Sequence, residues 1–353
     1  MLLKSGADNL INDYLAPSEL SFRLFEMGFR NRENLIGGMR VTGLKSGESM
    51  RLDTIGLKLQ QFDDTLRYVA RIDNRPGTMD EFAHVRLDGI IEANHLTSAI
   101  HQRNISGKTG YHLGLDAVMG RDSVLTVSLR PLDPMIAYKT WTINADNYVS
   151  FNMATKELRA NLDMSGNGSR LQLSAVPGDS IGAPENVNLK VTDVKLSDWL
   201  AISPFAPPVT GSVSADLKIR YNTSSLWGDG SIGLTDLTYG KERVGSFDLG
   251  VDISTNNKGV VNAEVALMID SIKTITAVGA LNDSTKANPF DLDFTMIRLP
   301  LRVVNPFLPA GTAKLSGMLN GNMQITGTLA APVFNGYINF DSTAVNVTML
   351  GTD

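Results

Sequence analysis

The sequence predicts an all-β fold, an elongated and twisted antiparallel sheet with few short helices. Three observations support this prediction. Apolar residues occupy every second position over most of the chain, and clusters of Gly, Asn, Ser and Pro separate these stretches. In addition, one stretch occurs in two copies, and corresponding residues of the two copies are separated by a constant number of positions. Strict alternation is typical of antiparallel strands that have one apolar and one solvated face.

The alternating stretches predict a series of strands along the chain. In FDLGVDI, for example, Phe247, Leu249, Val251 and Ile253 share one face and the residues between them share the other. The predicted strands are IGLKLQ (55–60), LRYVARID (66–73), VRLDGIIEA (85–93), YHLGLD (111–116), LTVSLR (125–130), WTINAD (141–146), ELRANLDM (157–164), RLQLSA (170–175), VNLKVTD (187–193), ADLKIRY (215–221), FDLGVDI (247–253) and FDLDFTM (290–296). Between them, stretches such as NRPG (74–77), SGNGS (165–169) and STNNKG (254–259) carry turn-forming residues.

Helix is expected in only a few places. DNLINDYLAPS (8–18) has apolar residues at helical spacing and should end before Pro17. LSDWLAIS (196–203) predicts one or two turns capped by Ser197. LPLRVVNPF (299–307) occupies the corresponding place before the second copy of the repeated stretch, so each copy is expected to follow a short, apolar, proline-flanked segment.

The repeated stretch predicts a repeated β unit. PFAPPVTGSVSADLKI begins at Pro204 and PFLPAGTAKLSGMLNGNMQI begins at Pro306. With Gly211 aligned to Gly317, an offset of 106 positions, Leu217 aligns with Met323 and Gly230 with Gly336. A constant offset through two strands is typical of repeat architectures. We therefore divide the chain into a lead-in (1–36), a first β segment (37–196), a second segment (197–295) and a third, truncated repeat of the second (296–353).

Composition excludes several classes of protein. The net charge is −5, the pI is near 5.5 and the charge is spread along the chain, which argues against a nucleic-acid partner. Without cysteine, disulfides and thiol chemistry are excluded. No run reaches the roughly 18 apolar residues of a membrane span, and the N-terminal residues lack a signal-peptide pattern. We interpret the chain as a fragment of a longer protein whose membrane anchor lies outside it.

The residues that usually carry chemistry show no catalytic pattern. Gly228, Gly230 and Gly233 match G-x-G-x-x-G, but strand alternation continues after them where a dinucleotide site needs a helix. We interpret these glycines as turn residues. The four histidines lie in one stretch without metal-ligand spacing, and alternation sends His84 and His112 to polar faces. The expectation is a protein that is not an enzyme and holds no metal or cofactor. The histidines are His84, His95, His101 and His112.

One pattern carries a resemblance to a known family. From Leu315 to Phe340 the chain reads L-x-G-x-L-x-G-x-x-x-I-x-G-T-L-x-x-P-x-F-x-G-x-I-x-F, with GTLAAPVFNGYINF (327–340) as its most specific part. This pattern resembles the repeats of the TamB and AsmA-like family of Gram-negative envelope proteins. The resemblance covers about 205–353 and is only general before that. The first copy departs from it, because SSLWGDG replaces the proline-containing hairpin.

The resemblance implies a U-shaped, taco-like β-groove with an apolar interior. It further implies a periplasmic protein that is anchored in the inner membrane, passes phospholipid between the inner and outer membranes, and has an outer-membrane barrel of the assembly family as its partner. The groove lining is then expected from inward-facing residues, and three aromatic side chains of the lead-in segments could plug the groove. The lining residues are Leu217, Ile219, Ile232, Leu234, Phe247, Leu249, Val251, Ile253, Val265, Leu267, Ile269, Phe294, Met323, Ile325, Ile338 and Phe340, and the plugs are Trp199, Phe205 and Phe307.

Three alternatives stay open from the sequence. An outer-membrane protein or autotransporter assembly scaffold would use exposed strand edges to template incoming strands. A surface adhesin would close its apolar faces into a β-sandwich and bind through its loops. The lead-in aromatics, instead of plugging a groove, could belong to surface segments packed on a sheet edge.

Overall fold

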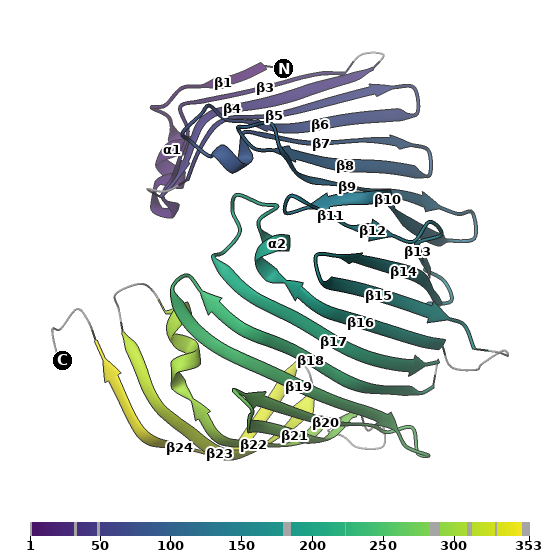
Figure 1. Ribbon diagram of the computed structural model, residues 1–353, viewed down its shortest axis with the longest axis vertical. Coiled ribbons are helices and arrows are strands. Elements are labelled where there is room, and N and C mark those ends of the chain that lie inside the picture. Colours follow the sequence, from purple (N-terminus) through teal and green to yellow (C-terminus); the bar gives the residue numbers. More distant parts are fainter. Residues whose placement is uncertain are drawn as a thin grey trace. The chain divides into compact units, whose positions relative to one another are not determined.

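The computed structural model describes residues 2–31, 34–47, 50–178, 185–222, 224–282, 290–308, 313–328 and 330–347. Within these ranges, 24 strands form one open antiparallel sheet, accompanied by a few short helices (Figure 1). The all-β prediction is confirmed, and each of the predicted strands overlaps an observed one. A U-shaped groove stays a prediction.

The chain divides into two compact units. The first comprises Met1–Glu157, Asn161–Asn167 and Ala201–Ala206, and the second comprises Leu158–Ala160, Gly168–Leu200 and Pro207–Asp353. The boundary near residue 158 falls inside the predicted segment 37–196.

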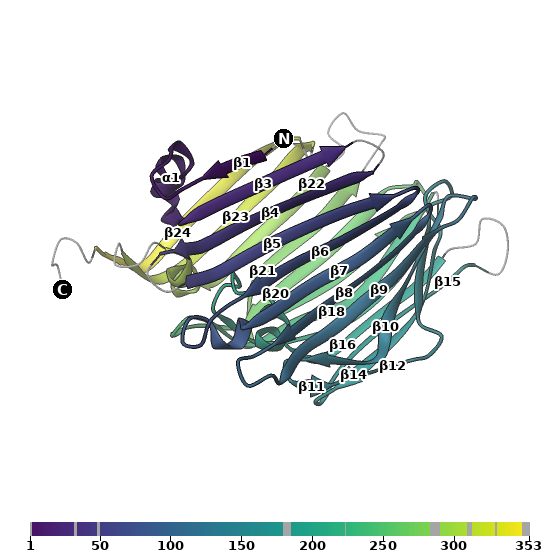
Figure 2. The ribbon, with the colours of Figure 1, turned by 90° about the horizontal axis from the view of Figure 1, so that it is seen from above.

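The first unit is a meander of antiparallel strands. Its central strands pair in the order in which they occur along the chain, from β3 to β10, and β1 pairs with the outer edge of β3 (Figure 2). Short connections between sequence neighbours produce this order. Its strands are β1 (Leu2–Ser5), β2 (Leu20–Ser21), β3 (Leu24–Asn31), β4 (Leu35–Ser46), β5 (Met50–Phe62), β6 (Thr65–Asp73), β7 (His84–Glu92), β8 (His95–Arg103), β9 (Thr109–Met119), β10 (Val124–Ile136), β11 (Lys139–Thr140), β12 (Thr142–Ile143) and β13 (Tyr148–Asn152), and β14 (Leu158–Gly166) contributes to both units.

The second unit continues the same pattern with longer strands. Each strand from β15 to β24 pairs with its neighbours in the sequence, and β16 to β19 lie side by side in Figure 1. These strands are β15 (Ser169–Val176), β16 (Glu185–Lys195), β17 (Val209–Tyr221), β18 (Leu226–Tyr239), β19 (Glu242–Thr255), β20 (Val261–Ile269), β21 (Ile272–Asn282), β22 (Phe290–Pro300), β23 (Lys314–Thr328) and β24 (Ala331–Asn346).

The repeated sequence forms two matching hairpins, β17–β18 and β23–β24. Leu217 pairs with Gly230 in the first hairpin, and Met323 pairs with Gly336 in the second. The register shifts at Gly211 in one strand and at Gly317 in the other, where both glycines have positive φ. The 106-residue offset therefore aligns pairing partners and bulges as well as sequence.

The short helices lie where the sequence predicts them. Helix α1 (Leu10–Leu15) ends before Pro17 and is capped by the Asn9 side chain, which accepts from two backbone N–H groups. Helix α2 (Leu196–Leu200) precedes the first hairpin, and the 3-10 helix η3 (Leu301–Phe307) precedes the second. Because α2 begins at Leu196, Ser197 lies within the helix, and its prediction as the N-cap is wrong. The remaining 3-10 turns are η1 (Ala16–Ser18) and η2 (Asp80–Phe82).

Among the residues that the structure describes, few side chains are fully buried in either unit. Leu52, Ile136 and Trp141 are about 1% exposed in the first unit, and Val244 and Ile269 are 2% exposed in the second. Most other apolar side chains of the strands are only half-buried. The apolar strand faces are therefore only partly removed from water.

Candidate functional site

Strand register places all sixteen predicted lining residues on one face of the second unit, which we call the apolar face. Residues that pair directly across antiparallel strands project to the same side of a sheet. The pairing therefore joins these side chains into rows that run across the strands. In β17 to β20 the rows are Ile219–Gly228–Ile253–Ala263, Leu217–Gly230–Val251–Val265, Ala215–Ile232–Leu249–Leu267 and Val213–Leu234–Phe247–Ile269.

The same rows continue into the last strands of the second unit. Val265 pairs with Ala277, which pairs with Phe294, which in turn pairs with Met323. Beside this row, Ile325 pairs with Phe334, Gly321 with Ile338 and Leu319 with Phe340. The predicted lining residues of β22, β23 and β24 therefore belong to the apolar face as well.

Register also assigns residues to the apolar face that the sequence did not single out as lining. Val187 and Leu189 of β16 pair with Ile219 and Leu217. Leu292 of β22 pairs with Ile325, and Phe334 is the next residue in that row. Alternation in the sequence could have assigned these residues to one face of their own strand. Which residues of neighbouring strands lie beside them follows only from the strand pairing.

The two faces of the second unit differ sharply in polarity. On β17, Asp216, Lys218 and Arg220 are exposed, whereas Leu217 and Ile219 between them are half-buried. Thirteen of the sixteen lining residues are half-buried in this way, and Ile269 is buried. The lining side chains of the last strand, β24, are more exposed: Ile338 is 44% exposed and Phe340 is 67% exposed. Most side chains of the apolar face therefore keep partial contact with solvent.

The three predicted plug residues lie in different environments. Trp199, in α2, is half-buried. Phe205 is 58% exposed. Phe307, at the end of η3, is 64% exposed, and its ring centroid lies 5.6 Å from that of Tyr239 at the end of β18. For Phe307 this contact matches the alternative of a surface segment packed on the sheet, and the plug role stays a prediction for all three residues.

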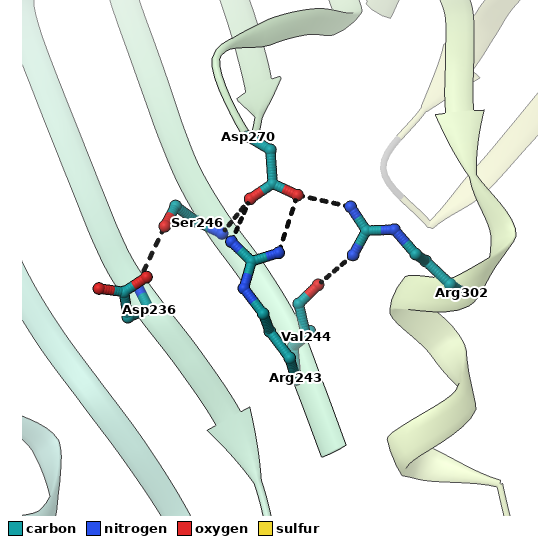
Figure 3. A network of polar contacts seen from close by, with 6 residues as sticks. All are labelled: Asp236, Arg243, Val244, Ser246, Asp270 and Arg302. Atoms are coloured by element: carbon teal, nitrogen blue, oxygen red, sulfur yellow. Dashed lines mark hydrogen bonds and ion pairs between the residues drawn. The ribbon is translucent and has the colours of Figure 1, made fainter.

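A polar network attaches η3 to the strands (Figure 3). Asp270, in the turn after β20, accepts hydrogen bonds from the Ser246 backbone N–H at 3.0 Å and from the Arg243 guanidinium at 2.9 Å. Arg302 of η3 donates to the second oxygen of Asp270 and, at 3.2 Å, to the backbone carbonyl of Val244. These donors hold the pKa of Asp270 well below its ordinary value, the Ser246 N–H first and the two guanidinium groups next.

We expect Asp270→Asn to destabilise the second unit by about 1–3 kcal/mol at neutral pH, because charge-assisted hydrogen bonds are replaced by neutral ones. A carboxylate whose pKa is lowered by folding adds stability above its unfolded pKa of about 4 and loses this contribution as the pH falls. The difference between wild type and variant in urea unfolding should therefore shrink below about pH 4. Asp252→Asn, on an exposed carboxylate of β19, is the control. An equal loss in both variants would contradict a specific role for Asp270.

The four histidines all lie on the polar face of the first unit. His84 pairs with Arg103, and His101 pairs with both Arg86 and His112. The His101 and His112 rings stack with centroids 4.3 Å apart, and burial, followed by the His112 charge, lowers the pKa of His101. The polar-face prediction for His84 and His112 is confirmed. Within the described ranges, no three His, Asp or Glu side chains converge as a metal site would require.

The glycine-rich stretch at residues 228–233 lies inside β18. Gly228 and Gly230 pair with Ile219 and Leu217 across the hairpin, and the strand continues to Tyr239. A dinucleotide site would need a helix N-terminus at this point. The interpretation of these glycines as turn residues is wrong, because all three lie within the continuous strand β18.

Comparisons of the chain with protein-family models, with curated proteins and with solved structures found no match. Among the described residues, no helix is long and apolar enough to span a membrane.

Proposed function

We propose that this chain is a non-enzymatic envelope protein whose apolar face shields phospholipid acyl chains during transport between the inner and outer membranes. The proposal includes a periplasmic location in a Gram-negative bacterium, an inner-membrane anchor in the full-length protein and an outer-membrane barrel of the assembly family as the partner. It rests on the resemblance of residues 205–353 to the TamB and AsmA-like family and on the arrangement of the apolar face.

One observation carries the proposal furthest: the apolar rows cross consecutive strands without a charged residue. From β17 to β20, each row contains only Ala, Gly, Val, Leu, Ile and Phe. Each methylene group that moves from water to such a surface contributes about 0.8 kcal/mol. A continuous surface of this kind suits an acyl chain, which needs apolar contact along its length and no specific hydrogen bond.

The half-buried state of the lining residues supports the same proposal. A closed β-sandwich core would exclude water from these side chains almost completely. Thirteen of the sixteen are instead half-buried, and Ile338 and Phe340 are exposed. Side chains in this state can exchange contact with water for contact with a lipid chain, which a fully packed core cannot do.

The edge of β24 favours a second candidate, an assembly scaffold that templates incoming strands. Among the described residues, β24 pairs only with β23, and nearly all of its residues are exposed. An unpaired edge of a 16-residue strand presents backbone donors and acceptors to another chain. Val333 and Phe334, which are 58% and 61% exposed, would add apolar contacts to such pairing.

Native mass spectrometry of the protein purified from a Gram-negative envelope tests the main proposal. We expect mass additions that correspond to bound phospholipid and that disappear after detergent exchange. A scaffold that acts through the β24 edge would instead be isolated without lipid. Lipid-free protein from several mild preparations would contradict the transport proposal.

A further inference from the structure

The polar face of the first unit is basic, although the chain as a whole is acidic. Its cross-strand row Lys4–Glu26–Arg40–Gly56–Arg71–Arg86–His101–His112 contains four cationic residues, two histidines and one carboxylate. The corresponding face of the second unit has the opposite character. On β18 and β19 it presents Asp229, Asp248 and Asp252.

A hollow of about 750 Å³ lies in this basic face, over strands β1 and β3 to β7. Gly28, Gly38 and Gly56 lie among its lining residues. Gly28 pairs with Gly38, so that two neighbouring strands lack a side chain at the same level of the face. The missing side chains leave room above the backbone. The charged residues that line the hollow are Lys4, Glu26, Arg40, Lys58, Arg71 and Arg86.

The positive charge of the hollow is only partly neutralised. Lys4 pairs with Glu26 at 3.0 Å, Arg71 with Asp73 at 3.5 Å and Arg86 with Asp88 at 2.8 Å. Arg40 and Lys58 form no ion pair within the part of the chain that the structure describes. Two cations therefore remain uncompensated, close to the three paired ones.

A second hollow adjoins the first and adds another cation to its lining. It shares Gly28, Gly38 and Lys58 with the first and adds Arg30, which also has no ion pair among the described residues. Arg30, Arg40 and Lys58 are exposed at the surface of these hollows. Like charges held together without counter-charges repel one another, and an anion that binds between them relieves this repulsion.

We propose that this hollow binds a ligand that carries phosphate groups. Guanidinium groups donate paired hydrogen bonds that match phosphate oxygens, and a lysine ammonium adds a point charge. The volume is that of a small-molecule site, large enough for more than one phosphate group. The site lies on the polar face of the first unit and makes no use of the apolar face, so it is independent of the proposed acyl-chain transport.

The first experiment measures binding of inorganic pyrophosphate to the full chain by isothermal titration calorimetry at low ionic strength. We expect saturable binding that the double variant Arg40→Glu/Lys58→Glu weakens at least about tenfold, since it removes two charge-assisted contacts to the anion and adds two negative charges. Arg67→Glu is the matched control. It replaces one cation by Glu on the same face, half of the charge change of the double variant. Arg67 pairs with Gln60, two positions from Lys58, but does not line the hollow. Binding to Arg67→Glu should change less than twofold.

A second arm identifies the source of the phosphate. Flotation with phosphatidylcholine vesicles, with and without phosphatidylglycerol, shows whether the hollow accepts lipid headgroups, and release of the protein by pyrophosphate links that binding to the same site. Pyrophosphate binding without vesicle binding assigns a soluble ligand. If the double variant does not melt like wild type, Arg40→Gln/Lys58→Gln replaces it. The absence of pyrophosphate binding, or an equal loss in Arg67→Glu, would overturn the proposal.

Discussion

Leu249→Arg is expected to abolish co-purification of phospholipid with the full-length protein and to reduce lipid supply to the outer membrane. Leu249 lies in the middle of the apolar face, between Ile232 on β18 and Leu267 on β20. A guanidinium at this position would place a charge on the proposed path of the acyl chains, at a cost of several kcal/mol unless water enters with it. An acyl chain that moves along the rows crosses every strand, so it must pass β19 beside this charge.

The control for this variant is the neighbouring residue. Asp248→Arg introduces the same side chain one position earlier, on the opposite face of β19, where the residue is exposed. We expect this variant to retain its lipid. Ile219→Asp and Lys218→Asp form a second pair of the same design on β17. Since the lining residues are half-buried, Leu249→Arg should melt close to wild type. A large loss of melting temperature before any loss of lipid would identify a closed core and end the transport proposal for this face.

Much of the second unit could be predicted from the sequence because its signals are local. Alternation within a strand assigns each residue to a face, and the offset between Gly211 and Gly317 places two bulges at equivalent positions. All sixteen lining residues consequently lie on the face that alternation predicts. The attachment of η3 could not be predicted in the same way. Arg302 and Asp270 are 32 positions apart, and only the folded chain brings them together.

The positive charge on the polar face of the first unit could not be predicted from the sequence. Along the chain its cations are balanced by acids, so the charge looks evenly spread. Many of those acids, such as Asp63, Asp64 and Glu81, lie in turns and in a 3-10 helix, whereas Arg40, Arg71 and Arg86 lie in strands. Pairing of the strands gathers the strand residues into one row, while the turn residues stay at the strand ends. Local charge balance therefore gives no information on the balance of a sheet face.

Gly230→Ala is expected to destabilise the second unit by about 3 kcal/mol or more. Gly230 has φ of 149°, in a region that residues with a side chain rarely adopt, and a Cβ at this position would lie 2.0 Å from the backbone carbonyl oxygen of Asp216 on the paired strand. A carbonyl in a sheet ladder cannot move away without breaking its hydrogen bonds. Strain and displacement therefore add to each other, which places the change among the most destabilising single substitutions.

Gly228→Ala is the matched control, two residues earlier on the same strand and the same face. A Cβ there would meet its nearest neighbour, the Lys218 carbonyl oxygen, at 3.8 Å, which is an ordinary contact. We expect this variant to change the free energy of unfolding by less than about 1 kcal/mol, and removal of a glycine from a strand can even stabilise it. Urea unfolding of both variants, followed by circular dichroism, measures the difference. Equal stabilities would mean that β17 and β18 pair in another register. In that register Gly230 would no longer lie opposite Leu217, and the alignment of the apolar rows that depends on this pairing would also be wrong.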